Sequence, residues 1–191
     1  MSKIAKKFYN QPTLQVAREL LGTILVHQAE SRIVAGKIVE TEAYLQGDPA
    51  CHANQGPTKR NASMFGPPGH SYVYLIYGIH YCFNVVTMPA GVGEAVLIRA
   101  LEPLKGLALM QQRRNQHRPE LLCAGPGRLC QALGITMDHD GISLSGDKLW
   151  LEKAEPVQAD NIIITTRIGI TQGADLPYRF YIANNKYVSR K

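Results

Sequence analysis

Two runs of sequence decide the fold: VETEAYL at residues 39–45 and YVYLIYGIHYCFN at residues 72–84. In the second run, aromatic and apolar residues alternate between the two faces of an extended chain. This two-residue period, rich in aromatic and β-branched side chains, is typical of a β-strand. Tyr77-Gly78 then interrupts the run before a second strand-like stretch. The run therefore predicts a β-hairpin with an aromatic residue at its tip.

The tip residue Tyr77 has two interpretations. A turn that faces solvent is normally built from Asn, Asp, Gly or Ser, so a large ring beside Gly78 indicates insertion into a partner. Tyrosines are also common in hairpins, and the ring could instead fold back onto the core. Spacing alone leaves both interpretations open.

The first run places two carboxylates, Glu40 and Glu42, on the same face of a strand predicted over residues 33–44. Arg99 lies in another apolar run, predicted as a strand over residues 95–101. A carboxylate in a strand is more often exposed at an edge than catalytic, and Arg99 could simply neutralise it. The alternative is a site whose apolar surroundings keep a carboxylate ionised and directed at a water molecule.

Length and charge indicate one basic domain. The chain has 191 residues, which fits a single domain over residues 1–191 with a full core. Its 21 Lys and Arg residues exceed its 15 Asp and Glu residues, which gives a formal net charge of +6. This excess favours a polyanionic partner, although a basic soluble protein without such a partner has the same balance.

The cysteine pattern predicts a reducing compartment. Cys51, Cys82, Cys123 and Cys130 form no C-x-x-C pair, and three of them lie in apolar runs. Cys51-His52 lacks a second pair of ligands at metal-binding spacing, so we expect no metal site and no cofactor. No signal peptide and no apolar run of about 18 residues is evident, which predicts a soluble, cytoplasmic protein without membrane contact.

The remaining segments complete a mixed pattern of helices and strands. A helix is expected over residues 12–22 with Thr13 as a possible N-cap, and another over residues 103–114 with Pro103 in its first turn. The polar stretch 46–69 is expected to be an ordered binding loop. The other expected elements are a strand over 23–26, a helix over 128–133, and strands over 149–152, 162–170 and 178–183.

Gly125-Pro126-Gly127 precedes the short helix over residues 128–133. Exposed backbone N–H groups at a helix start bind phosphate oxygens, and Arg128 would add charge. A plain turn from loop to helix is equally compatible with these residues. His52, in the polar loop, is likewise either a solvated side chain or a binding group.

Five motifs occur in order over almost the whole chain. They are IVETEAYL from Ile38, KRNASMFGPPGHSYVYLIYGIHYCFN from Lys59, LIRALEP from Leu97, GPGRLCQALGI from Gly125 and RIG from Arg167. Together they resemble the alkyladenine (3-methyladenine) DNA glycosylase family, and in its short N-terminus the chain is similar to bacterial members. The resemblance implies an α/β (mixed α+β) fold: a single compact domain with a curved, largely antiparallel sheet, flanking helices and a protruding DNA-inserting β-hairpin.

The resemblance also implies roles for individual residues. Glu42 matches the family's general base, and Arg99 the arginine that helps to hold the nucleophilic water and the phosphate of the flipped nucleotide. Tyr77 matches the residue that intercalates where the damaged nucleotide was, and Asn84 the residue that discriminates at the pocket floor.

The pocket walls follow in the same way. Tyr44 and Tyr74 match the aromatic walls of the family, and His52 the ring opposite them. The stretch LQGDPAC between Tyr44 and His52 departs from the acidic loop of animal relatives, which affects the placement of His52. The positions expected to contact the DNA backbone are Lys59, Arg60, Gly127 and Arg128.

The implied function is monofunctional base excision repair on double-stranded DNA, without a metal, a cofactor or an obligate protein partner. Alkylated or deaminated purines, of the 3-methyladenine, 7-methylguanine, hypoxanthine and ethenoadenine class, would be flipped out and released by hydrolysis of the N-glycosidic bond, leaving an abasic site. No lysine in these motifs is placed for a Schiff base, so no strand-nicking activity is expected. The alternative is a non-catalytic lesion-sensing or architectural DNA-binding protein that uses Tyr77 as a wedge.

Overall fold

A computed structural model describes residues 2–29 and 32–190 of the chain, and its centre is one eight-stranded sheet. The pairing order is β3-β4-β5-β2-β1-β6, β8 also pairs with β2, and β7 pairs with β8, all antiparallel. The strands are β1 (Ile24–Ala29), β2 (Arg32–Tyr44), β3 (Ser71–Ile76), β4 (His80–Val86), β5 (Ala95–Lys105), β6 (Leu149–Glu152), β7 (Ile162–Thr165) and β8 (Arg179–Ile182). The antiparallel sheet of the expected mixed fold is confirmed.

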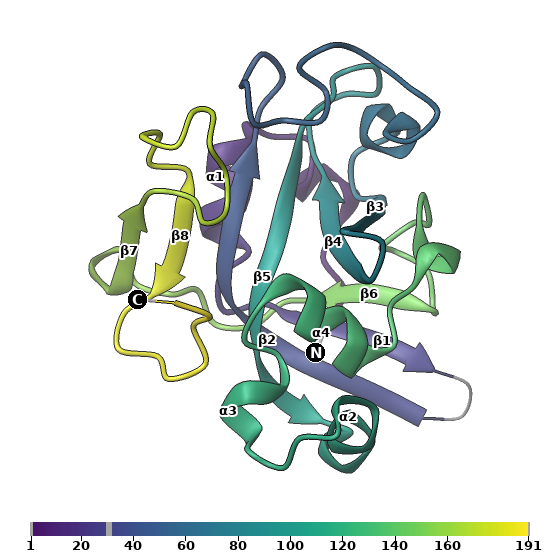
Figure 1. Ribbon diagram of the computed structural model, residues 1–191, viewed down its shortest axis with the longest axis vertical. Coiled ribbons are helices and arrows are strands. Elements are labelled where there is room, and N and C mark those ends of the chain that lie inside the picture. Colours follow the sequence, from purple (N-terminus) through teal and green to yellow (C-terminus); the bar gives the residue numbers. More distant parts are fainter. Residues whose placement is uncertain (1, 30–31, 191) are drawn as a thin grey trace.

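Helices cover both faces of the sheet. Figure 1 shows α1 behind β2 and α4 in front of β5, and these pairs are in contact. The helices are α1 (Thr13–Glu19), α2 (Leu107–Arg114), α3 (Pro119–Leu122) and α4 (Pro126–Leu133), and the short 3-10 helices are η1 (Lys6–Phe8), η2 (Ala62–Phe65), η3 (Met137–His139) and η4 (Ala159–Asn161). The buried side chains of α4 recur at helical spacing, and Gly134 ends the helix in a left-handed conformation.

Strand β2 is the longest element and positions the site. It pairs with β5 along one edge, while its other edge pairs first with β1 and then with β8. Near the point where β2 changes its partner from β1 to β8, its register with β5 shifts twice, once on each side of Glu40. The residues left out of the pairing there are Val39 and Arg99. Such bulges bend a strand and redirect its side chains, so the two ends of β2 pair with different strands of the sheet.

The start of the helix predicted over residues 103–114 is wrong. Pro103 lies in β5, which continues to Lys105 because β2 is long enough to pair with it. Pro103 pairs beside a register shift, where a residue without an N–H group is tolerated. The chain turns at Gly106, which has φ +76°, and α2 begins at the next residue.

Two other predictions need correction. Thr13 lies inside α1 rather than at its N-cap, and its buried hydroxyl forms hydrogen bonds with Thr87 and Glu94. The strand predicted over residues 162–170 ends at Thr165, and the chain after it leaves the sheet as a loop. Within the described residues, every helix is too short or too polar to cross a bilayer.

The hairpin of β3 and β4 forms as predicted, but its loop includes Ile79 as well as Tyr77 and Gly78, because Ile76 pairs with His80. Tyr77 and Gly78 both have positive φ, +53° and +71°, as a type I′ turn requires. Tyr77 is 82% exposed, so the interpretation in which its ring folds back onto the core is wrong. Leu75 and Ile79 beside it are also exposed, which gives the hairpin an apolar tip.

Candidate active site

A cavity of about 240 Å³ lies between the sheet and the loops that follow β2 and β7. It contains five of the residues expected in the site, one each from β2, the loop after β2, β3, β4 and β5. Its lining is Tyr44, Ala50, His52, Met64, Tyr72, Tyr74, Ile76, Cys82, Asn84, Leu97, Arg99, Pro126, Ile168, Gly169 and Ile170. Glu42 lies directly behind it, in contact with Tyr44 and Arg99.

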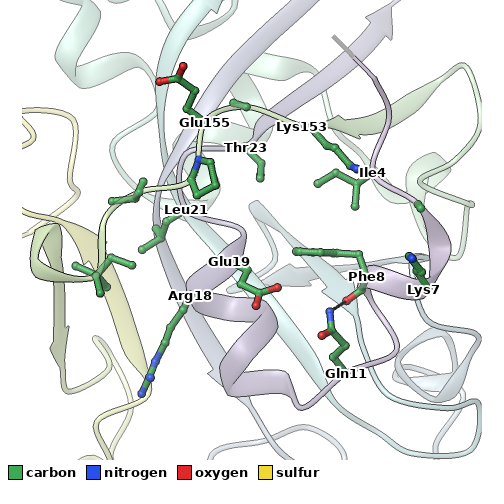
Figure 2. Close-up of a pocket in the computed structure, with 16 residues that line it drawn as sticks. Ile4, Lys7, Phe8, Gln11, Arg18, Glu19, Leu21, Thr23, Lys153 and Glu155 are labelled. Carbon is green, nitrogen blue, oxygen red and sulfur yellow. Dashed lines mark hydrogen bonds between the residues drawn. The ribbon is translucent and has the colours of Figure 1, made fainter.

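A larger groove of about 780 Å³ lies elsewhere on the molecule. Figure 2 shows it between the N-terminal segment, α1 and the chain around Glu155, with Ile4, Phe8 and Leu21 on its apolar floor. The residues that line it include none of those predicted to bind or cleave a substrate. The larger cavity is therefore not the one that the predicted residues line. The smaller cavity carries the ionisable and aromatic groups expected of a catalytic site.

Glu42 is fully buried and held by three donors. Its Oε2 accepts hydrogen bonds from Tyr44 Oη at 2.9 Å and from Arg99 Nη1 at 3.2 Å. Its Oε1 accepts one from the backbone N–H of Ile168 at 2.8 Å. An ionised carboxylate has about four acceptor sites, so these contacts leave one, on Oε1, for a further donor such as water. The interpretation in which Glu42 is exposed at an edge is wrong.

Arg99 joins the two carboxylates of β2. Its Nε donates to Glu40 Oε1 at 3.3 Å, on the opposite side from its contact with Glu42. Glu40 is fully buried as well, and Arg179 Nε donates to the same oxygen at 2.7 Å. Burial acts against the charge of Arg99, but Glu42 and Glu40 outweigh it and raise the pKa of Arg99. Arg99 therefore both neutralises the carboxylates and presents a permanent cation to the cavity.

Aromatic rings form one wall of the cavity. The centroids of His52 and Tyr74 are 4.5 Å apart, and His52 Nδ1 is 2.8 Å from the hydroxyl of Tyr72. Partial burial, and then the charge of Arg60, lowers the pKa of His52, which favours the neutral ring. Burial and then Glu42 raise the pKa of the Tyr44 hydroxyl, which therefore remains a donor.

Asn84 lies on β4, opposite Tyr72 of β3. It is 3% exposed, and its Nδ2 donates to the backbone oxygen of Tyr72 at 3.0 Å. This bond fixes the orientation of the amide at the cavity surface.

The structure brings the expected DNA-backbone positions to the two sides of the hairpin. Arg60 Nη2 donates to the backbone oxygen of Leu75 in β3 at 3.1 Å. A Cβ at Gly127 would lie 3.0 Å from the Cβ of His80, so the start of α4 packs against the first residue of β4. Lys59 and Arg128, the neighbours of these two positions, are exposed. The four expected DNA-backbone positions are Lys59, Arg60, Gly127 and Arg128.

Sequence reasoning missed three residues of the site. Ile168 was placed in a strand, yet it lines the cavity, and its N–H group binds Glu42. Arg167 and Asp48 form a buried ion pair beside the cavity, although they are far apart in sequence. The motif RIG and the single aspartate of LQGDPAC were the only local signals. Among the described residues, no cluster of His, Cys, Asp and Glu could hold a metal ion.

Comparison with known proteins agrees with the motifs. The family model described as Methylpurine-DNA glycosylase (MPG) matches residues 7–186. A protein of Carboxydothermus hydrogenoformans is 54% identical over 189 residues, which cover 98% of this chain and 99% of its own. One of Methanoculleus marisnigri is 57% identical over 187 residues, 96% of this chain and 97% of its own. Both are named "Putative 3-methyladenine DNA glycosylase". With its motifs in the same order and a match over nearly its whole length, the chain belongs to the methylpurine-DNA glycosylase family.

Proposed function

We propose that this protein is a monofunctional DNA repair glycosylase, which removes alkylated or deaminated purines from double-stranded DNA by hydrolysis of the N-glycosidic bond. The observation that carries the proposal is a buried carboxylate, Glu42, with one acceptor site left beside an aromatic cavity. The names of the relatives and the net charge of +6 support a DNA substrate. The enzyme would act in the cytoplasm without an obligate protein partner.

Base flipping gives the cavity access to its substrate. A purine stacked in a duplex cannot be reached, and flipping it out costs a few kcal/mol, least for a damaged or mispaired base. Stacking of a base on an aromatic side chain contributes roughly 1–3 kcal/mol, so Tyr77 in the vacancy and the cavity rings around the base can offset that cost. Lys59, Arg60, Gly127 and Arg128 would hold the DNA backbone beside the hairpin.

The chemistry requires one base and no redox step. Glu42 would accept a proton from a water bound to its remaining acceptor site as that water attacks C1′ of the sugar. Positive charge builds on the sugar ring as the bond to the purine breaks, and the carboxylate would stabilise it. Arg99, held between Glu40 and Glu42, would help to orient the water and the phosphate of the flipped nucleotide.

The aromatic wall would favour charged lesions. Alkylated purines such as 3-methyladenine and 7-methylguanine carry positive charge, and electron-rich ring faces attract cations. A neutral His52 adds no repulsion to this wall. Hypoxanthine and ethenoadenine are neutral and would be selected by shape and hydrogen bonding.

Asn84 would exclude normal guanine, because its fixed amide would crowd the exocyclic 2-amino group. Asn84→Ser is expected to raise the ratio of guanine-type to hypoxanthine excision by about 10-fold, since one such contact is worth about 1–3 kcal/mol. The check is single-turnover excision from duplexes that differ only in the lesion. An unchanged ratio would show that Asn84 has no such role.

Tyr77→Ala is expected to lower the excision rate at subsaturating enzyme by about 5–150-fold, because about 1–3 kcal/mol of stacking is lost. The loss should be smaller for a mispaired lesion, which flips more easily. Ile164→Ala is the matched control, since Ile164 is an exposed apolar residue on the edge strand β7. Equal losses in both variants would contradict insertion by the hairpin.

The products separate this proposal from its alternatives. The wild type should release a free purine and leave an abasic site that breaks only after treatment with alkali. A covalent DNA adduct trapped by borohydride would indicate a lyase and contradict the monofunctional mechanism. Lesion binding without base release would identify a damage sensor. A sensor gains nothing from a buried carboxylate near a polyanion, which is why the enzyme is favoured.

A further inference from the structure

A buried ion pair joins the two loops that flank the cavity. The side chain of Arg167 is completely buried, and that of Asp48 is 3% exposed. Both terminal nitrogens of Arg167 contact the carboxylate, with Nη2 3.0 Å from Oδ1. Arg167 also donates to the backbone oxygens of Ala43, at 3.1 Å, and Gly173, at 3.2 Å. One guanidinium therefore ties the end of β2, the loop after it and the loop after β7 together.

Each end of the ion pair reaches the cavity wall. The residue after Arg167 is Ile168, whose N–H group donates to Glu42. The guanidinium of Arg167 lies 4.7 Å from the ring centroid of Tyr44, whose hydroxyl is a second donor to Glu42. Asp48 Oδ1 accepts a hydrogen bond from the backbone N–H of Ala50, which lines the cavity.

A role in stability alone explains this arrangement poorly. Buried ion pairs often contribute no more stability than well-packed apolar residues of the same volume, because both charges lose their hydration. What an apolar pair cannot supply is direction: the fork of an arginine fixes its partners at defined angles. Here the partners that it fixes belong to the segments that orient two of the three donors to Glu42.

We propose that Arg167 and Asp48 form a positioning clamp for the catalytic carboxylate. By holding the loop after β7 against β2, the clamp keeps the Ile168 N–H group and the Tyr44 hydroxyl on Glu42, so that the remaining acceptor site of Glu42 faces the attacking water. Neither Arg167 nor Asp48 is among the residues that line the cavity, so they would act through Glu42. The inference therefore rests on the proposed role of Glu42 as general base.

The test compares an apolar clamp with the native one. Arg167→Met and the double variant Asp48→Leu/Arg167→Met should slow single-turnover excision at saturating enzyme by about 10²-fold, the effect of misplacing a catalytic group by about 1 Å. The Kd for lesion DNA should stay within a few-fold of the wild type. The matched control is Lys37→Met/Glu102→Leu, which removes a half-buried ion pair between β2 and β5 and should leave the excision rate unchanged. Native excision rates in the double clamp variant would overturn the proposal.

A glycine pair gives a milder version of the test. A Cβ at Gly173 would lie 3.0 Å from Asp48 Oδ1 and 3.3 Å from Arg167 Nη2, whereas a Cβ at Gly47 meets nothing within 4 Å. Both glycines have positive φ, so an alanine is strained at each. When the two variants are compared under conditions in which they have the same free energy of unfolding, Gly173→Ala should slow excision more than Gly47→Ala. Equal rates in the two variants would argue against the clamp.

A double-mutant cycle separates the clamp from the general base. If Arg167 acts through Glu42, Arg167→Met should cause no further loss of rate in a Glu42→Gln background. The same loss in both backgrounds would overturn the clamp and leave the role of Glu42 intact. A Glu42→Gln variant with the native rate would instead contradict the proposed function itself.

Discussion

Glu42→Gln should lower the single-turnover rate of base release by about 10²–10⁴-fold, the usual contribution of a general base. Glutamine has the same shape, so the side chain can still contact Tyr44 and Arg99. Its amide cannot take the proton of the attacking water, and it offers no negative charge to the sugar as the bond breaks. DNA affinity should be kept or increased, because a negative charge near a polyanion is removed.

The chain contains a matched control for this variant. Glu40 lies two residues before Glu42 in β2, is equally buried and also contacts Arg99, but it faces Arg179 and the backbone N–H of Ser189 instead of the cavity. Glu40→Gln should lower the free energy of unfolding and affect base release far less than Glu42→Gln. Equal losses of rate would mean that the charge network, and not one base, supports the reaction.

Arg99→Met should lower the free energy of unfolding by about 3–5 kcal/mol, the usual cost of removing one partner from a buried charge pair. Glu40 would keep Arg179, but Glu42 would lose its only ion-pair partner in the described part of the chain. Two carboxylates would then remain buried with a single guanidinium. Urea unfolding at about pH 7.5 measures the loss.

The matched control removes an arginine without leaving a buried charge unpaired. Arg128→Met, which removes an exposed arginine from α4, should change the free energy of unfolding little. Equal losses in the two variants would show that unpaired buried charge is not the cause of the loss in Arg99→Met.

The sequence predicted those parts of the fold that follow from local period and turn chemistry. The alternation of residues 72–76 and the dipeptide Tyr77-Gly78 were sufficient to indicate the hairpin, because a strand pattern followed by a turn glycine is typical of one. They did not give its register, since the loop also includes Ile79 and Ile76 pairs with His80. The two-residue period also placed Glu40 and Glu42 on one face, where Arg99 contacts both. The family motifs then indicated which residues would meet around the cavity.

What the sequence did not predict depends on long-range contacts. Pro103 is a good first residue for a helix, but pairing with the far end of β2 keeps it in a strand. Asp48 and Arg167 lie 119 positions apart, and nothing near either of them indicates its partner. The exposure of Tyr77 likewise depended on whether any part of the core lay within its reach.

Base release and DNA binding, measured together under single-turnover conditions for the wild type and Glu42→Gln, test most directly whether Glu42 is the base of a glycosylase. The substrates are duplexes with ethenoadenine or hypoxanthine and methylated genomic DNA, with alkali used to reveal abasic sites. We expect release by the wild type and a loss of about 10²–10⁴-fold in the variant, with binding retained. Lesion binding without release by the wild type, or equal release by both proteins, would contradict a glycosylase that uses Glu42 as its base.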